Sequence, residues 1–363
     1  MNTNIKMMLN QLPSRTWNRL GMNESFLTIE KELNDHVPSI LSEDKNVKVD
    51  PAAEVDPRWA SMEGGVGKDM DALTEGATVV SVCTEKDEKI EQPVLLNYDY
   101  KNGENAISRL WFHAKENSKI SAVIFLRSRD IIDNGLSALQ TKVYAEKGAS
   151  VHLYYVQLLG TELLCLNDVA GVCDDGAHIE VTKLELGAKE AYAGVLTNLK
   201  GQESSFKTNL GYHVEDGQKL DMNYVALHHG PKTESLMEIS GTLEENAYKV
   251  FRGTIDFQRG SQGAKGTEME NVLLLADDLV NQSIPLILCK EEDVEGNHGA
   301  SIGQLDDKLL FYLESRGIAP EDAKAIISEA RIDAICNLIP CDNVKDEVHA
   351  FETKRRKFYD SGK

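Results

Sequence analysis

The sequence predicts a mainly β protein with helical segments at both ends of the chain. From about Thr78 to Leu288, short runs rich in Val, Ile, Thr, Tyr and Phe are separated by Gly, Asn and Asp, a pattern typical of many short strands. After residue 290 the apolar residues follow a helical period instead. The chain is therefore expected to have three parts: an N-terminal helical segment and linker (1–75), a β core (76–289) and a C-terminal helical domain (290–363).

The charge balance argues against nucleic acid as a ligand. The formal net charge is −20, whereas affinity for phosphate backbones rests mainly on Lys and Arg. The one basic run, Lys354–Lys357, is interpreted as the solvated end of a helix, where positive charge complements the helix dipole.

Apolar segments and cysteine spacing indicate the cellular compartment of the protein. No window approaches the roughly 18 consecutive apolar residues of a membrane span, and the N-terminus lacks the apolar segment of a signal peptide. The six cysteines include no Cys-x-x-Cys pair, so neither a disulfide framework nor a structural zinc site is indicated. We expect a cytoplasmic protein with reduced thiols and no membrane partner.

The first part of the chain is expected to be a helical preface and a linker. Short helical patterns lie at Met7–Leu12 and Glu24–Leu33, and the polar stretch Leu41–Trp59 is typical of a linker. A second flexible stretch, Met62–Lys68, precedes a short helical pattern at Asp69–Leu73.

The β region shows a repeat in strand spacing. Alternation of apolar and polar residues is clearest in four segments: Phe206–Val214, Leu220–Ala226, Met237–Leu243 and Phe251–Phe257. These strands begin near residues 204, 219, 234 and 247, which gives steps of 15, 15 and 13 residues. Such spacing suits a solenoid whose turns stack on one another. A large sandwich or barrel also produces frequent short strands, so periodicity alone leaves both open.

Three helices are expected after residue 290. The first covers Leu305–Arg316, and Gly317 stands where a glycine commonly ends a helix. The second runs from Pro320 to about Leu338, because proline is favoured at the first helical position. The third starts with Asp342 as its N-cap.

Two motifs suggest enzymes but lack required features. Residues 64–69 resemble part of a phosphate loop, yet Met62 replaces its first glycine and Asp69 replaces the Ser or Thr after the lysine. Gly299–Gly303 matches the nucleophile elbow of hydrolases, with Ser301 as nucleophile. The preceding residues form a poor buried strand, so we favour a turn that begins a helix. A serine hydrolase stays as the alternative.

Three histidines and one cysteine carry side chains of the kind that bind metals, and His298 is the candidate ligand among them. His228 and His229 are neighbours on a strand, so their rings should point to opposite faces, with one exposed. His298 lies between an acidic loop and a predicted glycine turn, and neutral imidazole is a competent iron or zinc ligand. Cys289 is expected to be a small buried hydrophobe at the end of a strand.

The stretch from His298 to Ile318 resembles the signature of the SufB/SufD family of iron–sulfur cluster assembly proteins. Four further segments occur in the family's order and at about its spacing: Arg252–Phe257, Gly263–Gly266, Leu273–Leu275 and Ile284–Leu288. The resemblance covers roughly residues 100–340. It implies a right-handed parallel β-helix core with N-terminal and C-terminal helical segments.

The resemblance also implies a scaffold that is not an enzyme. In this family SufB pairs with SufD, the C-terminal helices dock the ABC-type ATPase SufC, and the complex supports assembly of a nascent iron–sulfur cluster. The Asn-His-Gly-Ala form at residues 297–300 resembles the SufD branch. The chain alone is then expected to hold no cofactor stably, and the cluster to be transient in the complex. Whether the isolated chain forms a homodimer is left open.

The resemblance assigns roles to particular residues. His298 matches the SufD histidine proposed to face the interface, and is the candidate cluster and metal residue. The candidates for binding SufC lie in the first C-terminal helix: Leu305, Leu309, Phe311, Tyr312 and Arg316. Some SufD proteins carry a cysteine where this chain has Gly296, so thiolate ligands are expected from the partner. A β-helical carbohydrate-acting enzyme and a self-associating solenoid without chemistry are the remaining alternatives.

Overall fold

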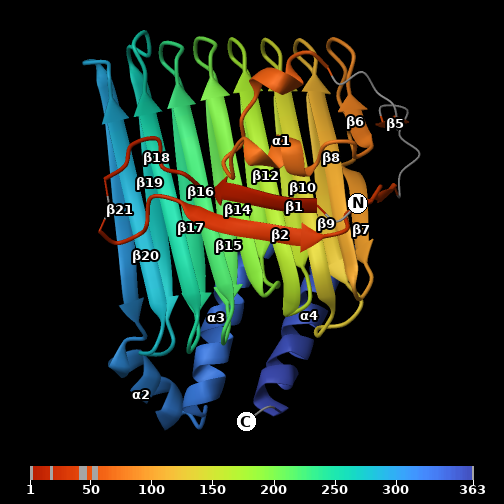
Figure 1. Cartoon of the computed structure of the whole chain (residues 1–363). Coiled ribbons are helices and arrows are strands. Elements are labelled where there is room, and N and C mark those ends of the chain that lie inside the picture. The colour runs from red at the N-terminus through yellow and green to blue at the C-terminus, as the bar shows by residue number, and fades with distance from the viewer. Residues whose placement is uncertain (1–2, 17–18, 41–46, 51–55, 362–363) are drawn as a thin grey trace.

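The core of the protein is a stack of parallel strands. The structure is a computed structural model that describes residues 3–16, 19–40, 47–50 and 56–361 (Figure 1). Successive strands alternate between two sheets, so each pair of strands forms one turn of a solenoid. This parallel β-helix of about 8 turns confirms the mainly β prediction and decides in favour of the solenoid over a sandwich or barrel.

Each sheet is named here by what covers its outer face. The hairpin-side sheet contains β5 (Val47–Asp50), β6 (Val79–Cys83), β8 (Glu104–Ala114), β10 (Asn134–Ala145), β12 (Glu162–Cys173), β14 (Glu190–Leu199), β16 (Lys219–His228), β18 (Tyr248–Phe257) and β20 (Val280–Cys289), with β3 (Asn34–Asp35) beside β8. The helix-side sheet contains β4 (Ser39–Ile40), β7 (Val94–Tyr100), β9 (Lys119–Ser128), β11 (Ser150–Leu158), β13 (His178–Glu185), β15 (Ser205–Val214), β17 (Glu234–Leu243), β19 (Ala264–Leu274) and β21 (Val294–Gln304).

The strand register explains the repeat seen in the sequence. Lys219 of β16 is aligned with Glu190 one turn earlier and with Tyr248 one turn later. One full turn therefore takes 29 residues at this point, because 219 − 190 and 248 − 219 are both 29. That length is about two of the strand steps found in the sequence, since each turn contains two strands. Inward residues of both sheets form a continuous apolar core.

The N-terminal segment is a β-hairpin, and the predicted helices at Met7–Leu12 and Glu24–Leu33 are wrong. β1 (Thr3–Leu9) pairs antiparallel with β2 (Ser25–Lys31). The hairpin lies across the outer face of the hairpin-side sheet (Figure 1). Residues 41–46 and 51–55 of the predicted linker lie outside the described residues, and Val47–Asp50 between them forms β5.

The burial pattern of the hairpin explains why it is not helical. Met7 and Leu9 of β1 and Ile29 of β2 are buried, and they pack in one cluster with residues of the sheet below. Alternate residues therefore face the sheet, which is the two-residue period of a strand. Packing on the sheet overrides a weak local helix propensity, since propensity is only a weak prior in short segments.

The glycine-rich stretch at 62–68 is a close-packed segment on the sheet rather than a phosphate loop. A Cβ atom on Gly65 would lie 2.2 Å from the backbone nitrogen of Val195, and one on Gly194 would lie 2.2 Å from that of Val66. The Val66 N–H donates to the Asp168 carboxylate at 2.8 Å. The short helix predicted after it is confirmed as α1 (Asp69–Leu73), and a 3-10 turn, η1 (Trp59–Ser61), lies upstream.

The three predicted C-terminal helices are confirmed. They are α2 (Asp307–Ser315), α3 (Pro320–Cys336) and α4 (Asp342–Ser361). Gly317 has a φ of 84° and its N–H donates to the Glu314 carbonyl, as expected for a glycine that ends a helix. Buried residues of α3 and α4 pack on the outer face of the helix-side sheet. Within the described part of the chain, no helix has the length and apolar character needed to cross a membrane.

Candidate functional site

The last turn of the solenoid forms an open end, defined here as β20 and β21. Each of these strands pairs with one strand of its sheet, β18 and β19 respectively, and in the described residues no strand pairs with its other edge. Side chains of β21 are largely exposed and most of those of β20 are half-buried, whereas those of β18, one turn before β20, are nearly all buried. A free edge presents unpaired backbone N–H and C=O groups, which makes it a template for another strand. The open end lies at the left of Figure 1.

His298 stands in the middle of β21 on the inner face of the open end. It is aligned with Glu268 of β19. A Cβ on Gly296 would meet Ile287 and Phe257 inside the solenoid, and His298, two residues later, shares that face because side chains alternate along a strand. Its imidazole is exposed because no further turn covers it among the residues described. The glycine turn predicted beside His298 is wrong, since Gly299 belongs to the same strand.

A layer of polar groups lies inside the solenoid next to the open end. Lys249 Nζ contacts the Glu270 carboxylate and donates to Asn281 Oδ1 at 3.0 Å and to Ser283 Oγ at 2.9 Å. Burial, together with the neighbouring charge of Glu270, raises the pKa of Glu268 to about 8. The Glu268 carboxyl is therefore mostly protonated at pH 7. This layer was not predicted from the sequence, although Glu268 and Glu270, two acidic residues two positions apart within the predicted β region, could have signalled it.

Cys289 is exposed, and its prediction as a buried residue is wrong. It is aligned with the buried Phe257 of β18, so it occupies an inward position. Such a position is buried only where another turn follows, and β20 belongs to the last turn. All six cysteines are free in the structure.

His298 offers a single imidazole at the open end. Among the residues that the structure describes, there is no group of three or more His, Cys, Asp and Glu side chains that could hold a metal ion. His228 and His229 point to opposite faces as predicted. His228 is buried and hydrogen-bonded to Thr233 and Ser235, whereas His229 is exposed. Burial lowers the pKa of His228 to about 4, so its ring is neutral.

Ser301 does not occupy a nucleophile elbow. It lies within β21, aligned with Asn271 of β19, and the next helix begins only at Asp307. An elbow requires a sharp turn from strand to helix at the serine itself. The pairing with β19 keeps the whole Gly299–Gly303 segment extended, so both the hydrolase interpretation and the predicted helix-starting turn are wrong.

α2 exposes most of the residues predicted to bind a partner. Phe311 is 71% and Tyr312 is 53% exposed, and Leu309 is exposed beside them. The Arg316 guanidinium lies 5.3 Å from the centroid of the Tyr312 ring, and Leu305 is partly buried. α2 packs against α3, so this aromatic surface is carried by the helical domain.

The basic run at Lys354–Lys357 is not a free cationic patch. Arg355 is buried, where it forms ion pairs with Glu215 at 3.0 Å and with Glu352 at 2.9 Å. The interpretation of the run as a solvated helix end is therefore wrong for Arg355. Its cation instead joins α4 to β15 and the residues that follow it.

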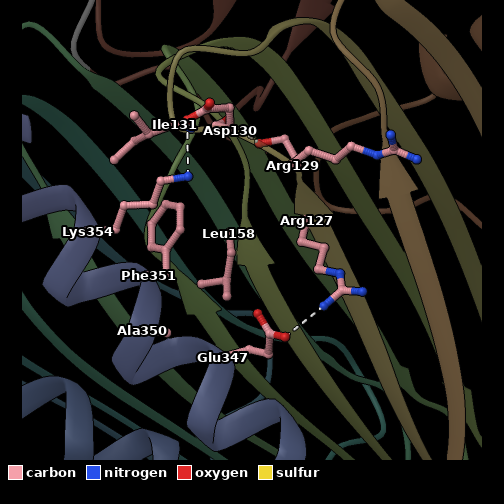
Figure 2. A pocket seen from close by; sticks show the side chains of 10 residues that line it. Arg127, Arg129, Asp130, Ile131, Leu158, Glu347, Ala350, Phe351 and Lys354 are labelled. Atoms are coloured by element: carbon pink, nitrogen blue, oxygen red, sulfur yellow. Dashed lines mark hydrogen bonds and ion pairs between the residues drawn. The ribbon is translucent and has the colours of Figure 1, made fainter.

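A surface pocket lies between α4 and the turn after β9 (Figure 2). Arg127 donates to Glu347 at 3.0 Å, and Lys354 lies 3.1 Å from Asp130 (Figure 2). Two of the cations that line the pocket are thus already paired across it. Both ion pairs connect α4 to the solenoid, so the pocket lies in the contact surface that attaches this helix.

Residues 98–331 match the model of the SufBD core domain of the SUF system for FeS cluster assembly. This match covers more than half of the chain. The chain belongs to the SufBD family. The matched segment extends from β7 through the open end into α3, and so includes His298 and α2.

The individual relatives share only modest sequence identity with this chain. The chain is 27% identical over 152 residues to the "Iron-sulfur cluster assembly protein SufD" of Bacillus subtilis, covering 42% of this chain and 35% of the relative. It is 23% identical over 209 residues to the SufB of the same organism, covering 58% and 45%. A SufBD family protein of Staphylococcus epidermidis is 24% identical over 260 residues, covering 71% and 56%. The matches span about a third to just over half of these relatives. The SufD match agrees with the SufD-like form around His298.

Proposed function

We propose that this chain is a SufD-like scaffold subunit of the SUF machinery, that it acts in the cytoplasm and that it performs no catalysis of its own. One observation carries the proposal: the open end combines two free strand edges, within the described part of the chain, with an exposed, inward-facing His298. A sister scaffold of the SufB type covers this end by strand addition to β20 and β21, a mode in which backbone hydrogen bonds supply affinity.

The nascent iron–sulfur cluster is the cargo of this pair. Neutral imidazole is a suitable iron ligand, so His298 supplies one ligand from the centre of the contact surface. Clusters are held mainly by cysteine thiolates, and Gly296 stands two residues before His298. In this proposal the partner supplies the remaining ligands, and a cluster shared across the interface is released when the two subunits separate.

The SufC-type ATPase docks on the helical domain. α2 supports this assignment because Leu309, Phe311 and Tyr312 are exposed together on one short helix. Large aromatic residues are typical anchors of protein interfaces. α3 and α4 are firmly packed on the helix-side sheet, so movement of a docked ATPase would be transmitted to the solenoid and its open end.

The decisive experiment is anaerobic purification of the chain with its SufB-type and SufC-type partners, followed by measurement of iron and acid-labile sulfide. We expect a three-component complex that carries both. His298→Ala should lower both contents severalfold while the complex stays intact, because the substitution removes one exposed imidazole without opening the core.

His229→Ala is the matched control, since His229 is also an exposed histidine beside a strand of this solenoid. It should leave iron and sulfide unchanged. Normal cluster content in the His298→Ala complex would contradict the assigned role of His298, and failure of the native chain to co-purify with a SufB-type subunit would contradict the scaffold function itself.

A further inference from the structure

The loop that joins β1 to β2 reaches the open end. The described parts of this N-terminal loop are residues 10–16 and 19–24. In Figure 1 the loop leaves the hairpin, passes over β18 and extends to the side where β20 and β21 end the solenoid. The chain's first residues are thereby brought next to its last solenoid turn.

The N-terminal loop is held in place by a buried network. Arg252 of β18 donates through Nε to the Met22 carbonyl at 2.8 Å. The same guanidinium contacts Asp221 of β16, which also accepts a hydrogen bond from Asn10 Nδ2 at 2.8 Å. The Leu12 N–H donates to the Asn23 carbonyl at 2.8 Å and so ties the two arms of the loop together. Such anchoring gives the loop a defined position on the sheet.

Apolar packing places the loop against the edge strand itself. Leu12 and Met22 are buried in one cluster with Val250 of β18 and Ile284 of β20. β20 is the last strand of the hairpin-side sheet. The loop therefore covers the outer face of the strand whose free edge is available for pairing.

A strand added to β20 would lie beside the N-terminal loop. Paired strands are about 4.8 Å apart, so the outward side chains of the added strand occupy the same layer as Ile284. Leu20, two residues before the buried Met22, is 60% exposed.

We propose that the N-terminal loop is part of the subunit-pairing surface and that Leu20 contacts the strand that the SufB-type subunit adds to β20. The inference rests on the proposed function and extends it, because it assigns part of the interface to a segment outside the solenoid. The loop would then cover the outer face of the continuous sheet that β20 forms with the added strand of the SufB-type subunit. In addition to covering the outer face of the hairpin-side sheet, the hairpin then holds this loop at the subunit interface.

Site-specific photo-crosslinking tests the contact. p-Benzoylphenylalanine is placed at Leu20 in the full chain, and the SufB-type subunit is the probe. Ile132 is the matched control position, because it is 57% exposed but lies between β9 and β10, several turns from the open end. We expect a crosslink to the SufB-type subunit from position 20 and none from position 132. A complex that forms normally but gives no crosslink from position 20 would overturn the proposal.

Binding affinity gives a second readout. Leu20→Asp should weaken the complex about tenfold or more, as loss of an apolar interface anchor commonly does, whereas Ile132→Asp should not change it. Equal binding by both variants overturns the loop contact but leaves the scaffold function standing. Absence of any complex with the native chain instead overturns the scaffold function. A Leu20 crosslink to a second copy of this chain alone would overturn the assigned partner.

Discussion

Asp221 of β16 and Arg252 of β18 form a buried ion pair directly beneath the N-terminal loop. Each side chain is only 1% exposed. Asp221 also accepts hydrogen bonds from Asn10 and from Ser25. The pair therefore joins two neighbouring turns of the solenoid to the hairpin that crosses them.

Asp221→Asn should strongly destabilise the protein. The substitution leaves the Arg252 cation buried without a counter-charge, which typically costs about 3–5 kcal/mol. Urea denaturation measures the change in the free energy of unfolding. Asp216→Asn is the control, because Asp216 is exposed and accepts a hydrogen bond from Asn246 at 2.9 Å, and it should stay within about 0.5 kcal/mol of the native chain. Similar values for both variants would show that the pair does not hold the hairpin.

Gly194→Ala should separate the 62–68 segment from the sheet. The new Cβ would lie 2.2 Å from the Val66 backbone nitrogen, and overpacking of this kind costs about 1–3 kcal/mol. The expected result is a lower thermal midpoint and faster proteolysis near Val66. Gly303→Ala is the control because no described atom lies within 4 Å of its added Cβ. A thermal midpoint as high as that of the control would refute the close-packing interpretation.

His213 should make the attachment of the C-terminal helices sensitive to alkaline pH. Burial and the nearby Arg355 lower its pKa, but its hydrogen bonds to Glu244 and Glu352 outweigh them and raise the pKa from 6.5 to about 9. Because the folded-state pKa is raised, the stabilisation is complete below pH 6.5 and is lost as the pH rises through 9. At about 1.36 kcal/mol per pKa unit, a rise from 6.5 to about 9 contributes at most about 3.4 kcal/mol.

The test compares the free energy of unfolding between about pH 6 and pH 10, a range that brackets both pKa values. The other groups that face this site from the packed elements are Glu215, Lys324 and Ser328. The free energy of unfolding of the native chain should fall over this range. That of His213→Gln should be lower at the acidic end of the range and should fall less as the pH rises. His229→Gln, at an exposed ring, should keep the native slope. If the free energy of unfolding of His213→Gln falls with pH as steeply as that of the native chain, His213 is not the source of the pH dependence.

Phe311→Asp should abolish most SufC binding without unfolding the chain. Deleting the whole helical domain is a poor test, because α3 and α4 cover buried residues of the helix-side sheet. Phe26→Asp is the control, since Phe26 is 72% exposed but lies on the hairpin. Affinity for the ATPase, measured by isothermal titration calorimetry, should fall at least about tenfold for Phe311→Asp alone. Unchanged affinity would exclude α2 as the docking element.

Much of the candidate site could be predicted from short stretches of sequence. The family resemblance around residues 298–318 is enough to single out His298 and the exposed helix that follows it. The layer of Lys249, Glu268 and Glu270 could not be recognised in the same way, because those residues meet only when β18 and β19, which belong to different sheets, face each other across the solenoid interior. The contact between the N-terminal loop and β20 was likewise hidden, since about 260 residues separate its two sides.

Features that depend on near neighbours could be read from the amino-acid sequence. The alternation in β15 to β18, the helix-ending Gly317 and the helix-starting Pro320 all follow from backbone geometry within a few residues. The placement of Met7–Leu9 in a hairpin, the extended conformation of β21 and the exposure of Cys289 emerge only when the whole chain is folded. The hairpin depends on packing against the sheet below it, and the exposure of Cys289 depends on whether another turn of the solenoid follows. An inward residue is therefore core in the middle of the stack and surface at its end.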